Sequence, residues 1–156
     1  MTFCIIFILS IIAFPFIANG APARDASAVF VDVEGKEWIL SEIRTAGISA
    51  WIDRQKLEAD GMGGFFIISF NEGRLNGMGA PNRCFGPYTA SSNRTLNIGD
   101  IASTMMAAFR EPQGLREHEY FDYLSNVKRW DLWDGKLELY SINNTGKEVV
   151  LVFEHQ

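Results

Sequence analysis

The C-terminal part of the chain carries the pattern that most restricts its fold, two β-type runs joined by a two-residue turn. Residues 130–133 read Trp-Asp-Leu-Trp and residues 136–140 read Lys-Leu-Glu-Leu-Tyr, with Asp134-Gly135 between them. An Asp-Gly pair between such runs predicts a β-hairpin, because both turn positions require a positive φ. A second turn sequence, residues 143–146, leads into the apolar run 149–153. This region is therefore predicted to be antiparallel sheet.

The alternation of these C-terminal runs also predicts which side chains share a face of the sheet. Residues two apart in a strand point to the same side. We expect one set to be mostly buried and integral to the domain: Leu137, Leu139, Val150 and Val152. Glu138 and Leu151 are expected on the opposite face.

Earlier segments add more short strands and one main helix. Strands are expected where β-rich runs are bounded by turn sequences, at residues 38–40, 65–70, 74–77, 85–90 and 95–98. Residues 50–57 fit a short helix or a loop. The helix is predicted over residues 114–128, where Tyr120, Phe121, Leu124 and Val127 recur on one face. These elements predict a mostly β, α+β domain built as a small antiparallel barrel or sandwich.

The N-terminus has the pattern of a secretory signal peptide. Residues 3–18 are apolar except for Ser10, and small residues follow. We expect residues 1–20 to be the signal, with cleavage after Gly20 or after Ala23. Residues 21–34 are then a flexible leader, and 35–156 form the domain. The alternative is an uncleaved anchor, but the run is short against the roughly 20 apolar residues of a membrane span.

The positions of the cysteines and the net charge indicate where the protein is located and what it can bind. No cysteine follows the apolar run, so lipid attachment is not predicted and the protein is expected in the periplasm or outside the cell, with envelope association left open. Cleavage of the signal removes Cys4 and leaves Cys84 as the single cysteine. We expect Cys84 to be buried, with pairing to another molecule as the alternative. The net charge of -5, without a cluster of Lys or Arg, argues against nucleic-acid binding.

Residues 77–108 contain the most distinctive motif of the chain. A glycine-rich turn leads into Asn-Arg-Cys-Phe-Gly, and Ser-Thr-Met-Met-Ala-Ala follows about twenty residues later. This arrangement resembles the signature of the META domain family, also called HslJ-like. The matching positions are Gly77, Gly79, Asn82, Arg83, Gly86, Tyr88, Thr104, Met106 and Ala107. The resemblance extends over roughly residues 35–153 and implies a lipocalin-like antiparallel barrel whose helix covers or plugs one opening.

Both cysteines of the family signature are absent here. Pro81 stands at the first position and Ala108 at the second. The resemblance implies that the two positions face each other where a disulfide is missing. The other motif residues are expected to have mainly structural roles. For Asn82 a role in binding stays open as an alternative.

No residue pattern points to catalysis, a cofactor or a metal. His118 and His155 lack metal-ligand spacing, and no nucleophile motif is present. The acidic residues Glu117, Glu119 and Asp122 are expected on a solvated helix face. Trp130 and Trp133 lie on opposite faces of one strand, and Trp51 is expected in the core, with an exposed place at a barrel mouth as the alternative.

The combined prediction is an exported, monomeric, non-catalytic protein. By resemblance, it supports envelope integrity or stress tolerance, through interaction with another envelope or exported protein. The alternative is a barrel that carries a small apolar ligand or lipid, and an uncharacterised hydrolase ranks below both. A cavity lined by Phe and Trp favours the carrier, and an interior filled with side chains favours the interaction role.

Overall fold

The computed structural model describes residues 27–107 and 111–155. Within them, three hairpins have a two-residue loop in which both residues have a positive φ: Ala46-Gly47, Glu72-Gly73 and Asp134-Gly135. They join β1 (Glu37–Thr45) to β2 (Ile48–Trp51), β3 (Ile67–Asn71) to β4 (Arg74–Met78), and β8 (Arg129–Trp133) to β9 (Lys136–Ile142). Turns of this kind match the twist of the flanking strands. The Asp134-Gly135 hairpin is confirmed.

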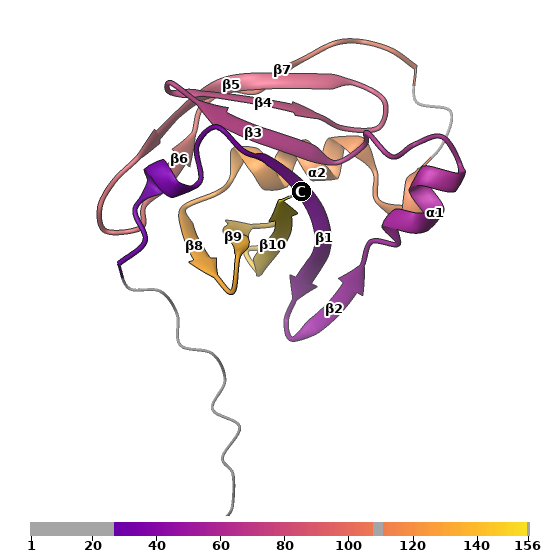
Figure 1. Cartoon of the computed structure of the whole chain (residues 1–156). Coiled ribbons are helices and arrows are strands. Elements are labelled where there is room, and N and C mark those ends of the chain that lie inside the picture. Colours follow the sequence, from indigo (N-terminus) through magenta and orange to yellow (C-terminus); the bar gives the residue numbers. More distant parts are fainter. Residues whose placement is uncertain (1–26, 108–110, 156) are drawn as a thin grey trace, which may run out of the picture.

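The strands form a nearly closed antiparallel barrel, which confirms the predicted fold class. The remaining strands are β5 (Arg83–Ala90), β6 (Leu96–Ile98), β7 (Ala102–Ser103) and β10 (Glu148–His155). In the described residues, eight strands follow the order β6-β5-β4-β3-β1-β10-β9-β8, while β2 pairs with β1 and β7 with β5 (Figure 1). A bridge between Thr95 and Arg129 brings the two ends of this order together.

Helix α2 (Glu117–Ser125) lies across the barrel, behind β3 in Figure 1. Its buried residues Tyr120 and Leu124 point into the core, and Ser141 Oγ of β9 donates to the Tyr123 carbonyl at 2.6 Å. Outside the barrel, Asp53 caps the N-terminus of α1 (Arg54–Ala59), where its side chain accepts from the Lys56 N–H. A 3-10 turn, η2 (Pro112–Gly114), precedes α2. Among the residues described, no helix has both the length and the apolar character to cross a membrane.

Side chains fill the barrel interior, and aromatic rings dominate it. The Phe30 ring packs against Phe70, Tyr88 and Trp130, with centroids 5.1–5.3 Å apart. The Tyr120 ring meets Phe66 edge-on at 5.2 Å. Aromatic side chains bury large apolar areas, so this packing provides much of the driving force for closing the barrel.

The N-terminal edge of the domain lies before residue 35. Residues 30–32 form a 3-10 turn, η1 (Phe30–Asp32). Val33 is fully buried, and the Trp38 indole N–H donates to its carbonyl at 2.9 Å. The second half of the expected leader 21–34 is thus packed on the core, because Phe30 and Val33 supply apolar area to it. The signal peptide and its cleavage sites lie outside the described residues.

Strand β10 faces the core with the opposite set of side chains from the one predicted. The register pairs Leu151 with Leu139 and Phe153 with Leu137, so these four share the inner face. Val150 and Val152 lie on the other side, opposite Tyr140 and Glu138. All of them are buried, but the predicted grouping is wrong for Val150, Val152 and Leu151. The run Val-Val-Leu-Val-Phe is apolar at every position, so the pairing register alone selects its inner face.

Candidate functional site

Several of the family-signature residues meet at the turn between β4 and β5, beside the N-terminus of α2. Asn82 is the buried polar residue of this turn, and it follows a cis Ala80–Pro81 peptide bond. The Gly79 N–H donates to the Asn82 carbonyl at 2.6 Å and closes the turn. The asparagine side chain is therefore held beneath the segment that runs from β7 to residue 107.

Each polar atom of the Asn82 amide has two partners. Oδ1 accepts from Thr104 Oγ1 at 2.8 Å and from the Met106 N–H at 2.6 Å. Nδ2 donates to the Met106 carbonyl at 3.0 Å and to Glu117 Oε2 at 2.7 Å. All of the hydrogen-bonding capacity of this buried amide is used. Such an amide holds the residues that it bonds to in fixed positions. Asn82 thus joins residues 101–107, which we call the strap, to the barrel.

Glu117 is the hydrogen-bond partner of Asn82 that the sequence interpretation missed. Its Oε1 accepts from the N–H groups of Ala80 and Asn82, both at 2.6 Å. Its Oε2 accepts from the Asn82 amide. The prediction of a purely solvated face is therefore wrong for Glu117. The sequence did carry a signal for it, because the stretch from Glu117 to Val127 resembles the Glu-x-x-aromatic-x-x-x-Leu-x-x-Val helix of the META family.

Three glycines of the motif lie so close to neighbouring atoms that a side chain would clash there. A Cβ on Gly79 would lie 2.6 Å from Phe121 Cζ, and one on Gly77 would lie 2.7 Å from the Ile67 carbonyl oxygen. A Cβ on Gly86 would lie 2.9 Å from the Asp100 carbonyl oxygen. None of the three has a positive φ, so the absent side chain, rather than an unusual backbone, explains the glycine.

The other signature residues separate into buried and exposed positions. Tyr88 lies in the aromatic core, where its hydroxyl donates to Glu34, and burial followed by this bond raises the pKa of Tyr88 to about 12. Arg83 points to solvent, while its N–H donates to Thr104 Oγ1 at 3.1 Å. Met106 is held by its backbone and is 62% exposed.

The two positions of the missing disulfide are not both described. Pro81 lies in the turn beside Asn82, whereas Ala108 lies outside the described residues. Their predicted proximity therefore stays a prediction. Cys84 is buried as expected, and burial raises the pKa of its thiol to about 12, with the Glu117 carboxylate adding to the shift. At neutral pH this thiol is protonated and is a poor nucleophile.

The structure also shows where the two histidines and three of the tryptophans lie. His118 is exposed on α2, and the His155 ring packs edge-on against Trp38 at 5.4 Å. Trp130 is buried in the core, whereas Trp133 is only partly buried. Trp51 is 65% exposed on β2, so its expected place in the core is wrong. Within the described residues, no three His, Cys, Asp or Glu side chains are grouped to hold a metal ion.

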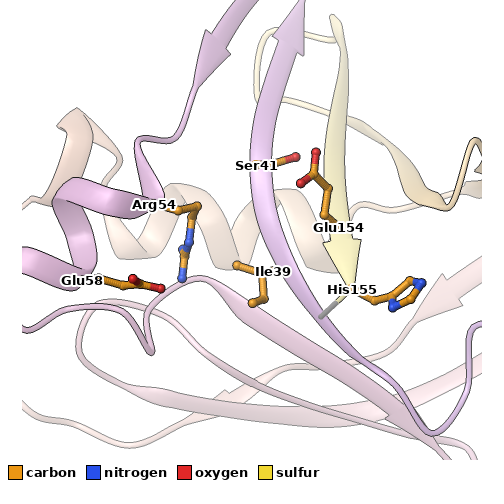
Figure 2. A pocket seen from close by; sticks show the side chains of 6 residues that line it. All are labelled: Ile39, Ser41, Arg54, Glu58, Glu154 and His155. Carbon is orange, nitrogen blue, oxygen red and sulfur yellow. The ribbon is translucent and has the colours of Figure 1, made fainter.

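A surface pocket of about 190 Å³ lies between α1 and the ends of β1 and β10 (Figure 2). Its lining combines two apolar or hydroxyl side chains with four charged or titratable ones: Ile39, Ser41, Arg54, Glu58, Glu154 and His155. Arg54 donates to the carbonyls of Gly63 and Phe65, and Lys136 pairs with Glu154 at 2.6 Å. In Figure 2 the His155 ring points away from Arg54 and Glu58. These groups hold the surface together and do not converge on one point.

A family model shows the family of the chain, and two solved structures share its fold. The META domain family model matches residues 31–156. The structure is similar to an NMR structure of a protein from Burkholderia xenovorans, with a TM-score of 0.63 and 20% identity over 94% of this chain and 99% of that one. It is also similar to the crystal structure of a DUF4847 family protein from Bacteroides vulgatus, with a TM-score of 0.54 and 16% identity over 83% and 98% of the chains. A search of curated proteins finds no match.

Proposed function

Because the chain belongs to the META domain family, we propose that it is an exported, non-catalytic protein that binds another envelope or exported protein. In this role it supports envelope integrity under stress. The apolar N-terminal segment followed by small residues supports export. The acidic net charge of -5 fits a protein partner better than a nucleic acid.

The observation that carries this proposal is the filled barrel. Trp38, Phe66, Tyr120 and Trp130 are each at most 1% exposed and occupy the space that a ligand would need. A lipocalin-like barrel that carries an apolar molecule keeps an interior cavity for it. The packing seen here therefore favours the interaction role over the carrier.

Large apolar side chains on the outside support the same conclusion. Ile48 and Trp51 of β2 are 75% and 65% exposed, and Met105 of the strap is 98% exposed. Aromatic side chains and methionine are enriched where proteins bind one another. The outer surface is thus better suited to recognition than the interior.

Complementation tests this proposal. A strain that lacks the gene is challenged with detergent and osmotic stress, and receives either the full chain or a chain without residues 1–20. We expect the full chain alone to restore growth, because the protein must be exported to act. Equal rescue by the truncated chain would refute export as a requirement. Saturable hydrolysis by the purified protein, lost on changing one acidic residue, would refute the non-catalytic role.

A further inference from the structure

One edge of strand β1 pairs with two different strands. Its first part, Glu37–Ile39, pairs with β3, and its last part, Glu42–Thr45, pairs with β2. The change follows a bulge at Ser41, where the register against β10 shifts. Among the described strands, β2 pairs with β1 alone. The opposite edge of β2 therefore presents backbone N–H and C=O groups that no described strand covers.

Apart from its short length, this edge lacks the devices that usually protect a strand edge. All four residues of β2 are exposed, and their sequence is Ile-Ser-Ala-Trp. Natural edges are commonly blocked by a charged side chain, a proline or a bulge. Strand β2 contains no charge and no proline, and its register against β1 is regular. An open, uncharged edge with two large apolar side chains is a template for pairing with another chain.

We infer that β2 accepts an extended, uncharged segment of a partner polypeptide as an added strand. This inference rests on the proposed binding function and names its site. The added backbone would pair with the free edge of β2, as in other cases of strand addition. Ser49 and Trp51 lie on one face of β2, while Ile48 and Ala50 lie on the other. The added strand would therefore gain an apolar contact on each face.

The charges near β2 favour an uncharged partner. The β1 residues paired with Trp51 and Ser49 are Glu42 and Arg44. These two side chains form an ion pair at 3.4 Å, and Arg44 also bonds to Glu138 at 2.5 Å. Ser49 Oγ donates to the Glu42 carboxylate. Because Arg44 and the hydroxyls of Ser49 and Tyr140 bond to the two carboxylates, these groups offer little to select a charged segment.

The size of the edge favours a partner segment over a second copy of this chain. Four residues of strand extend about 13 Å. Two such edges paired with each other would bury much less than the roughly 1,200 Å² of a stable interface. A short segment can bind such an edge transiently, because main-chain hydrogen bonds supply affinity without a wide contact.

The test is an NMR titration of the ¹⁵N-labelled protein with a blocked peptide of alternating Val and Thr. The control peptide has Pro in place of each Thr, so it cannot pair as a strand. We expect the first peptide to shift the amides of residues 48–52 and the Trp51 indole, and the second to shift neither. Ile48→Lys combined with Trp51→Lys should raise the dissociation constant by about tenfold or more, since edge charges oppose pairing.

Phe85→Lys is the matched control variant. Phe85 is 40% exposed, but its strand is paired on both sides, with β4 and β7. This variant should bind the peptide as the unchanged chain does, and thermal melting checks that both variants fold. No shift at millimolar peptide, shifts elsewhere, or equal binding by the edge variant would overturn the inference. Shifts of the same amides with protein concentration alone would also overturn it, because a second copy would then be the occupant.

The complementation assay separates this inference from the proposed function. If the full chain and the edge variant protect the envelope equally well, the edge is not the site and the proposed function stands. If the full chain gives no protection, the proposed function fails whatever the titration shows.

Discussion

Asn82 and Glu117 form one hydrogen-bonded unit although 35 residues separate them in the chain. Asn82 Nδ2 donates to Glu117 Oε2 at 2.7 Å, and the Asn82 N–H donates to Oε1 at 2.6 Å. This unit ties the β4–β5 turn to the first residue of α2 and, through Met106, to the strap. The most distinctive motif of the sequence therefore organises the fold at the place where three segments meet.

Removing the amide should destabilise the protein, because it ties three segments together. We expect Asn82→Ala to lower the free energy of unfolding by about 1–3 kcal/mol, because the Met106 N–H and the Glu117 carboxylate lose a buried partner. Asn82→Asp should cost more, since it places a second carboxylate beside Glu117. Urea unfolding measures both changes. In a double-mutant cycle with Glu117→Ala, additive losses would contradict the direct coupling.

Gly79 should not tolerate even a methyl group. A Cβ at this position would meet Phe121 Cζ at 2.6 Å and Glu117 Oε1 at 2.7 Å. Gly79→Ala is expected to lower the free energy of unfolding by about 1–3 kcal/mol through overpacking. Gly64→Ala is the control, because a Cβ there meets nothing within 4 Å. Equal melting temperatures for the two variants would show that the helix can move away from the turn.

The buried hydroxyl of Tyr120 should be dispensable. The side chain is fully buried, and its hydroxyl has no hydrogen-bond partner in the described part of the chain. Tyr120→Phe keeps the packing against Phe66 and removes an unsatisfied polar atom, so stability should stay unchanged or rise. Tyr120→Leu, which loses the ring, should destabilise the protein. A marked loss in the Phe variant would reveal a partner for the hydroxyl.

Stability should fall at alkaline pH. The pKa of Cys84 is about 12 in the folded chain against an ordinary value of 9.0, and that of Tyr88 is about 12 against 10.0. Folding therefore favours the neutral forms. Their contribution is fully present below pH 9 and is lost as the pH rises toward 12. Urea titrations from pH 7 upward should show this loss, and Cys84→Ala should show less of it.

Strand β10 should be essential for folding. It pairs with β1 on one side and β9 on the other, and Val149, Leu151 and Phe153 are fully buried. Deleting residues from 147 onward would open the barrel and expose its core. We expect no cooperative thermal transition in the truncated chain. Native-like circular dichroism with a cooperative melt would show that the barrel does not depend on this strand.

Local chemistry allowed several elements to be predicted from sequence alone. The Asp134-Gly135 turn is specified by two residues that accept a positive φ, and the helical spacing of Tyr120 and Leu124 places α2. The family signature likewise predicted an antiparallel barrel with a main helix. These features depend on neighbouring residues or on a recognised motif, so no knowledge of distant contacts was needed.

The tertiary structure alone decided the features that depend on distant partners. The inner face of β10 was set by its register against Leu137 and Leu139, because every residue of the run 149–153 is apolar. Trp51 is exposed because its strand, β2, pairs with β1 alone among the described strands and all four of its residues face solvent. Glu117 became part of the signature site only when the barrel brought α2 against the β4–β5 turn. Sequence patterns report local periodicity and turn chemistry, whereas the choice among equally apolar or equally charged side chains is made by packing.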